Sequence, residues 1–209
     1  VNVRLTTMRR SVMYHHHRKH FWGLFSVPRV EWKSISDETL DITQFGILRM
    51  TIFSLVPAVS FLIGITQIGW SLDGSVFHQI ALMSAIPMAI AFYVLVVAFT
   101  LLMAYFTFSM EKTFGDEASF GRCLLFVTYT ATPMYMAGLV GFVPIVWLCM
   151  TILLPAVCYS VYLLYLGIPI YMNIDEGKGY VVSTSIISAG LCMLVVFNVL
   201  TVIMWTTML

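Results

Sequence analysis

Charged side chains are missing from long apolar stretches of this chain, and their absence predicts its architecture. Between Thr51 and Met110 the sole charged residue is Asp73, and none occurs over 123–174 or after Gly179. A charged side chain at the centre of a bilayer costs about 2.5–3.5 kcal/mol even on insertion scales. We therefore expect these stretches to cross a membrane.

The length of each apolar stretch predicts how many helices span the bilayer. A spanning helix needs about 20 residues, and an unbroken helix over 121–170 would overshoot, so we expect a hairpin with a break near Gly141. The second stretch is longer than needed and is expected to tilt, kink at Pro87 or continue beyond the bilayer near Met110. The predicted fold is an all-α integral membrane protein, a bundle of five transmembrane helices. The predicted spans are about 46–70, 78–108, 121–141, 143–170 and 180–207.

Residues 1–45 form a predicted cytoplasmic N-terminal region, and 46–209 form the membrane domain. A short helix is expected near 28–35, because Pro28 suits a first helical turn. The pattern predicts an interfacial helix with aromatic residues at headgroup level and cations near anionic lipid. A docking helix for a cytoplasmic protein partner is the alternative. The apolar face would hold Phe25, Trp32 and Ile35, and the cations outside it are Arg29 and Lys33.

The first 20 residues are expected to be a solvated basic tail. Met13 is an alternative start, which would make residues 1–12 a non-native extension. No signal-peptide pattern is found, because the apolar run begins only near Gly46. Consecutive histidines without a nearby carboxylate or cysteine favour a tail or a tag over a metal site. These histidines are His15, His16, His17 and His20.

The amino-acid composition indicates that lipid, and not water, surrounds the apolar surface of the protein. Hydrophobic residues make up 60% of the chain and charged residues 10%, whereas soluble domains carry about 25% charged residues. A soluble chain of 209 residues could not bury so much apolar surface, so the lipid bilayer is the expected partner. A basic segment beside anionic lipid explains the N-terminal cations without nucleic-acid binding.

Lysines and arginines lie only on alternate breaks between the predicted spans. They occur in the N-terminal region, at Lys112 and Arg122 in the second break, and at Lys178 in the fourth. Positive residues favour the cytoplasmic side. The N-terminus is therefore predicted to be cytoplasmic and the C-terminus periplasmic.

Few polar groups inside the spans are candidates for chemistry. Arg49 and His78 lie at span ends, where we expect them to snorkel to water, and Asn198 is expected to hydrogen-bond a neighbouring helix. No catalytic motif, cofactor motif or metal-ligand spacing is found, so an enzyme is not predicted. The cysteines are expected to act as small hydrophobic residues buried in lipid; they are Cys123, Cys149, Cys158 and Cys192.

Prolines and small residues predict how the helices bend and pack. Proline-broken helices expose backbone groups to substrates in transporters, although membrane helices also tolerate proline for structural reasons. Small residues at every fourth position allow close helix packing, and we favour packing within the chain over dimerisation. The prolines are expected to interrupt four of the five spans, and they are Pro57, Pro87, Pro133, Pro155 and Pro169. The small residues are Ala81, Ala85, Ala89, Ala137, Gly141, Ser185 and Ala189.

Several motifs carry a resemblance to a known family. They are Trp22-Gly23-Leu24-Phe25, Thr66-Gln67-Ile68-Gly69-Trp70, Ala131-Thr132-Pro133, Gly138-Leu139-Val140, Pro144, Val146-Trp147-Leu148-Cys149 and Tyr162-Leu163-Leu164-Tyr165-Leu166-Gly167-Ile168-Pro169. With these residues the chain resembles the bacterial branch of the Yip family of Ypt/Rab-interacting membrane proteins. The resemblance implies a bacterial inner-membrane protein of five spans with a cytoplasmic N-terminus. Eukaryotic relatives act in vesicle traffic with Rab-type GTPases, but the resemblance implies no activity for the bacterial branch.

Two functions are compatible with this sequence. The leading hypothesis is a non-enzymatic scaffold or adaptor, whose motif residues serve packing rather than a binding groove. The rival is a small-solute channel or carrier, alone or as a homo-oligomer, that uses the proline-broken helices around Pro133 and Pro169. It would have a water-filled cavity near Tyr129, Tyr162 and Asn198. The candidate motif and packing positions are Trp22, Tyr129, Pro133, Gly138, Pro144, Tyr162, Tyr165, Gly167, Pro169 and Asn198.

Overall fold

The computed structural model of the chain is helical, and it describes residues 27–36, 42–114, 119–172 and 174–208. The expectations for Trp22, Phe25 and the histidine cluster lie outside the described residues. The elements in chain order are α2 (Pro28–Ser36), α3 (Ile42–Ile63), η1 (Gly64–Ile68), α4 (Leu82–Phe114), α5 (Phe120–Thr130), α6 (Thr132–Ala137), η2 (Gly138–Phe142), α7 (Val146–Tyr171) and α8 (Glu176–Met208).

The expected membrane fold is confirmed. Four helical stretches are long and apolar enough to cross a bilayer, and the pair 120–130 and 132–142, bent by 44°, makes a fifth candidate span. The second span begins at Leu82 rather than near residue 78, and its helix continues past Met110 to Phe114. The expected hairpin is also present, because the chain turns between η2 and α7.

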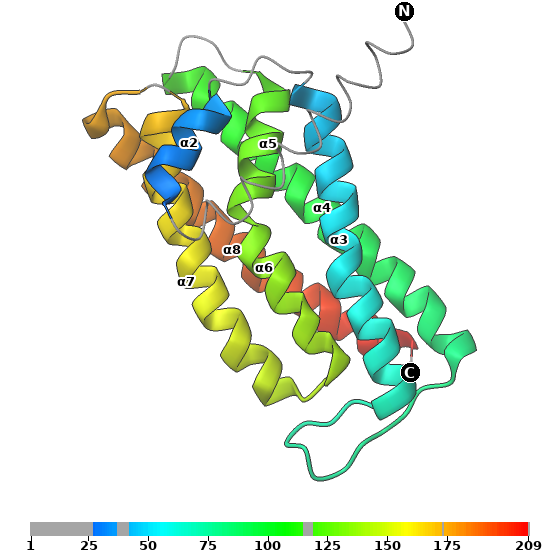
Figure 1. The fold of residues 1–209 in the computed structure, drawn as a ribbon. Coiled ribbons are helices and arrows are strands. Elements are labelled where there is room, and N and C mark those ends of the chain that lie inside the picture. The colour runs from blue at the N-terminus through cyan, green and yellow to red at the C-terminus, as the bar shows by residue number, and fades with distance from the viewer. Residues whose placement is uncertain (1–26, 37–41, 115–118, 173, 209) are drawn as a thin grey trace, which may run out of the picture.

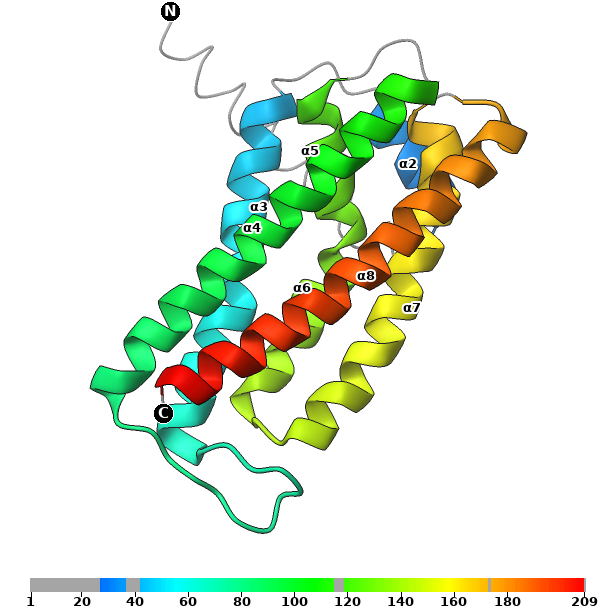
Figure 2. The same cartoon turned by 180° about the vertical axis from the view of Figure 1, so that it is seen from behind.

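The helices form two layers. In Figure 1, α3, the α5–α6 pair and α7 lie in front of α4 and α8, and Figure 2, seen from the other side, shows α4 and α8 in front. One end of the bundle carries α2, the beginnings of α3, α5 and α8, and the ends of α4 and α7. We call this the basic end, because Arg29, Arg49, Lys112, Arg122 and Lys178 all lie on these segments.

Only one proline accompanies a break in a span. Pro133 lies in the first turn of α6, directly after the break at Ala131 that separates α5 from α6. A first-turn proline loses no hydrogen bond, because the N–H at that position has no intrahelical partner. Pro57, Pro87 and the two prolines of α7 lie inside helices that continue through them. The expectation of four interrupted spans is therefore wrong, because these helices accommodate their prolines.

Small residues let α3 contact η2 at backbone distance. A Cβ atom added to Gly138 would lie 2.5 Å from Cβ and 2.9 Å from Cα of Pro57. One added to Gly64, the first residue of η1 directly after α3, would collide with the carbonyl oxygen of Gly141. Helices in lipid associate through such close packing, since they gain no hydrophobic free energy from contacting one another.

The end opposite the basic end is closed by hydrogen bonds between two connecting segments. Trp70 and His78 exchange backbone hydrogen bonds of 3.0 and 2.9 Å, and the Ser71 N–H donates to the Pro144 carbonyl at 3.0 Å. Gly69 makes the turn into this loop with φ of +91°, a conformation that favours glycine. His78 therefore lies in a loop beside Trp70, and not at the end of a span.

Replacing Gly138 with alanine is expected to destabilise the bundle. The new methyl group would overlap Pro57 in a helix that cannot move away easily, and overpacking of this kind costs about 1–3 kcal/mol. The measurement is the midpoint of thermal unfolding of the purified protein in detergent. Gly177→Ala is the matched control, because a Cβ there would meet only an Asp175 oxygen at 3.4 Å. Equal midpoints for the two variants would contradict this account of the α3–η2 contact.

Candidate functional site

A buried aromatic cluster joins α2 to the rest of the basic end. Trp32 is fully buried, and its ring lies 4.8 Å from Phe126, 5.8 Å from Tyr171 and 6.4 Å from Tyr129, measured between centroids. Phe126 and Tyr171 also stack on each other at 5.4 Å. Aromatic pairs at these distances add attraction beyond the area that they bury. The cluster therefore holds α2 against α5 and α7.

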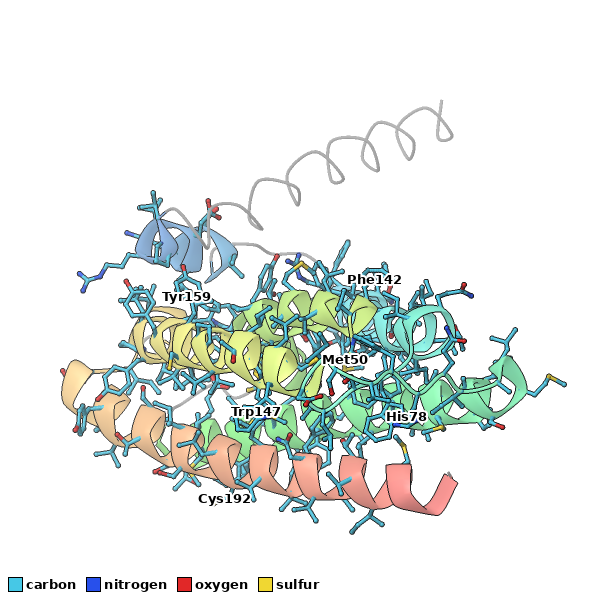
Figure 3. All side chains as sticks on the ribbon, turned by 90° about the horizontal axis from the view of Figure 1, so that it is seen from below. Met50, His78, Phe142, Trp147, Tyr159 and Cys192 are labelled. Carbon is cyan, nitrogen blue, oxygen red and sulfur yellow. The ribbon has the colours of Figure 1, made fainter. Side chains whose placement is uncertain are left out.

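Gly167 provides the space that Trp32 occupies. A Cβ atom at this position would lie 2.6 Å from Cε2 of Phe126 and 2.7 Å from Cε2 of Trp32. The conspicuous Tyr165-Leu166-Gly167 motif thus includes a residue that must be small for α2 to dock on α7. Figure 3 shows α2 beside α7 near Tyr159.

The predicted faces of α2 are correct, but the apolar face has a different neighbour. Trp32 and Ile35 share a buried face, while Arg29 and Lys33 are exposed. The buried face packs on the protein core. Trp32 therefore contacts protein rather than lipid, because its ring fits the gap above Gly167, and the interfacial position of α2 stays a prediction.

Polar groups connect α4, α5 and α7 beside this cluster. Arg122 donates from Nη2 to the Tyr171 carbonyl at 2.8 Å, and the Tyr171 hydroxyl donates to the Arg122 carbonyl at 3.3 Å. The Cys123 thiol donates to Oε2 of Glu111 at 2.8 Å, and Glu111 is only 5% exposed. Cys123 is therefore a hydrogen-bonding residue in the protein core, contrary to the expectation of a lipid-buried small hydrophobic residue.

Arg49 turns toward the bundle instead of snorkelling to water. Its Cζ atom lies 3.9 Å from the ring centroid of Tyr129 and 4.8 Å from that of Phe53. These are cation–π distances, which stabilise a guanidinium group removed from water. The Nε and Nη2 atoms of Arg49 are buried, and no acceptor meets them among the described residues.

A groove of about 660 Å³ lies within the bundle, lined by residues of α3, α4, α6, η2, α7 and α8. Most of its lining is apolar, and it extends from Pro144 at the loop end to Leu164 nearer the basic end. Asn198 lies in this lining, but its amide donates to the Leu194 carbonyl of its own helix at 2.7 Å. The prediction that Asn198 hydrogen-bonds a neighbouring helix is wrong, because its amide nitrogen donates to a carbonyl within α8 instead.

The structure distributes the sequence-predicted positions over five places. Tyr129 and Gly167 belong to the aromatic cluster, and Pro169 faces Gly179 at the start of α8. Pro133, Gly138 and Pro144 lie along α6, η2 and the turn that follows. Tyr162 and Tyr165 are exposed on α7, where they contact Tyr159 and Tyr180. Asn198 lies in the groove, and Trp22 is outside the described residues.

The contacts of several residues at the basic end could not be predicted from the sequence. Phe126 and Tyr171 are ordinary aromatic residues of apolar stretches, and no spacing relates either of them to Trp32. Glu111 follows the second apolar stretch directly, so a carboxylate at the end of a span was the available signal.

The remaining cysteines and ligand types show no candidate metal centre. Cys192 lies on the outer side of α8 (Figure 3), Cys158 is exposed, and Cys149 borders the groove. Across the described ranges, no three histidine, cysteine, aspartate or glutamate side chains lie close enough to hold one ion.

Comparison with known proteins supports the resemblance found in the motifs. The family model described as the Yip1 domain matches residues 22–197. Inner membrane protein YohC of Escherichia coli (strain K12) is 34% identical over 186 residues, which covers 89% of this chain and 95% of the relative. YohC of Escherichia coli O6:H1 gives the same values. No solved structure matches the chain significantly.

Replacing Trp32 with alanine is expected to release α2 from the bundle. Truncating a fully buried tryptophan costs about 3–5 kcal/mol, which exceeds what a nine-residue helix gains by itself in water. The rate of trypsin cleavage after Arg29 and Lys33, followed by mass spectrometry, should rise. Val30→Ala is the control, since Val30 is on the same helix and 64% exposed. Unchanged cleavage in the Trp32 variant would show that α2 is held by other contacts.

Proposed function

The chain belongs to the Yip1 domain family and is a multi-pass inner-membrane protein like YohC, and from that premise we propose that it acts as a non-enzymatic scaffold or adaptor. The observation that carries the proposal is the docking of α2. Its apolar side is anchored in the aromatic cluster, so its other side is presented in a fixed orientation.

The exposed side of α2 has the chemistry of a docking surface. It combines Val27 and Val30, which are 53% and 64% exposed, with the exposed cations Arg29 and Lys33. Apolar contacts give affinity, while cations select an acidic partner and steer its approach. We propose that the partner is a cytoplasmic protein with an acidic surface, contacted together with the lipid headgroups.

The orientation in the membrane is part of this proposal. The described lysines and arginines all lie on segments of the basic end, and positive residues favour the cytoplasmic side. We propose that the basic end faces the cytoplasm and that the C-terminus is periplasmic. The acidic partner would then meet α2 in the cytoplasm.

The groove is the observation that favours the rival carrier. A carrier for small polar solutes would bring Tyr129, Tyr162 and Asn198 to one water-filled cavity. Tyr129 is instead 1% exposed within the aromatic cluster, and Tyr162 is 50% exposed on α7. Asn198 alone of the three borders the groove, whose apolar lining suits a hydrocarbon chain better than a polar solute. The adaptor is therefore the better-supported proposal.

Photo-crosslinking from α2 tests the adaptor proposal. A photoreactive amino acid at Val30 should give a protein adduct in intact cells, and Arg29→Glu with Lys33→Glu should abolish it by repelling an acidic partner. The matched control position is Val195 of α8, which is also a 64% exposed valine. An adduct that is identical at Val195, or that survives the charge reversal, would count against a docking function of α2.

Reporter fusions test the orientation. A reporter that is active only in the periplasm should be active when it is fused after Leu209, because the C-terminus follows the fifth span. The same reporter fused within the Glu111–Arg122 connection should be inactive. The opposite pattern would place the basic end outside the cytoplasm and remove the basis for a cytoplasmic partner.

A further inference from the structure

The guanidinium group of Arg49 presents one complete edge without an acceptor. The two buried nitrogens that lack a hydrogen-bond partner among the described residues are Nε and Nη2. In a guanidinium group these two nitrogens carry parallel N–H bonds that point in the same direction. This edge matches two oxygens of one carboxylate or phosphate group in a bidentate contact.

The surroundings of Arg49 hold the guanidinium but do not neutralise it. Its planar group lies over the Tyr129 ring at 3.9 Å, with Phe53 of the same helix at 4.8 Å. Among the described residues, the buried carboxylate of the basic end is that of Glu111, which accepts a hydrogen bond from Cys123 and lies near the charge of Arg122. A buried cation that lacks an anionic partner is costly, and no described residue accepts a hydrogen bond from Nε or Nη2 of Arg49.

A third donor without an acceptor borders the same tyrosine. Trp32 packs against Tyr129 with ring centroids 6.4 Å apart, and its Nε1 is buried without a partner in the described part of the chain. Buried N–H groups are nearly always paired in native proteins. Arg49 and Trp32, which both contact Tyr129, therefore carry three buried donor atoms that lack an acceptor among the described residues.

The depth of Arg49 in the bundle indicates the source of the anion. The backbone from Arg49 to Ile68 is helical throughout, so it is about 28 Å long at 1.5 Å per residue. The hydrocarbon core of a bilayer is about 30 Å thick. If Ile68 lies at one boundary of the hydrocarbon, Arg49 lies at the other, where phospholipid phosphates begin.

We propose that Arg49 is a binding site for a phosphate group at the basic end of the bundle, held in bidentate contact by Nε and Nη2. The phosphate is that of a bilayer phospholipid or free phosphate, and both offer the same paired oxygens. Tyr129 and Phe53 position the guanidinium by stacking on it. This site is independent of the proposed docking surface on α2, whose cations are exposed and lie on another helix.

Ligand-dependent unfolding of the full-length, delipidated protein in detergent tests the site. The probes are dioctanoyl phosphatidic acid, inorganic phosphate and dioctanoylglycerol, which has the same acyl chains without a phosphate. A ligand that binds only the folded state raises the unfolding midpoint. We expect phosphatidic acid to raise it in the wild type and dioctanoylglycerol to have a much smaller effect.

The variants Arg49→Lys and Arg49→Gln separate charge from geometry. Lysine keeps the cation but lacks the paired donors, so the apparent affinity for phosphatidic acid should fall about tenfold. Glutamine should remove the response. Lys112→Gln removes an exposed cation from the same end and should leave the affinity within about twofold. Native mass spectrometry of bound phosphatidic acid gives a second readout if the glutamine variant does not fold.

The outcomes distinguish the sources of the anion. A response to inorganic phosphate with the same dependence on Arg49 would support the site and identify free phosphate as its ligand. An equal response to dioctanoylglycerol, or an unchanged affinity in both Arg49 variants, would overturn the proposal. A double-mutant cycle gives a further outcome that would overturn the proposal. In that outcome, neutralising Asp37, Glu38 and Asp41 lowers the stability as much as Arg49→Gln does, and combining the changes lowers the stability no further. Arg49 would then pair with a carboxylate of this chain.

Discussion

Helices in hydrocarbon gain no hydrophobic free energy from contacting one another, so this bundle depends on how closely its backbones can approach. The contact between α3 and η2 shows the constraint most directly. Gly138 meets Pro57, and Gly64 of η1, directly after α3, meets the Gly141 carbonyl, at distances that leave no room for a side chain. These contacts hold η2, which follows the bent α5–α6 pair, against α3 and η1.

The basic end depends on a different interaction, the insertion of Trp32 between α5 and α7. The ring fills the space above Gly167 and contacts three other aromatic rings. Hydrogen bonds between Arg122 and Tyr171 and between Cys123 and Glu111 hold the neighbouring helices together. A short helix that would not be stable alone is thereby fixed on the basic end of the bundle, with Arg29 and Lys33 exposed.

These two ends suggest different roles for the same fold. One end has the close backbone contacts and the hydrogen-bonded loop. The basic end holds the buried carboxylate of Glu111 and a guanidinium group whose paired donors lack an acceptor among the described residues. The family and the inner-membrane location are established by similarity to YohC. This division of chemistry between the two ends is the reason that we propose an adaptor rather than a solute carrier.

The sequence by itself determined the membrane class, the candidate spans, the hairpin, the short N-terminal helix and the family. All of these depend on local sequence patterns. The spans, for example, follow from uncharged stretches whose length can be compared with the thickness of the hydrocarbon core. The sequence also separated the two faces of α2, because helical spacing alone places Trp32 and Ile35 together. It could not show that Trp32 faces protein rather than lipid, or that Arg49 turns inward and Asn198 bonds its own helix. Only the tertiary structure decided these points, because an aromatic ring is equally compatible with lipid and with protein. The choice depends on which distant residues, such as Phe126, Gly167 and Tyr171, are brought beside it.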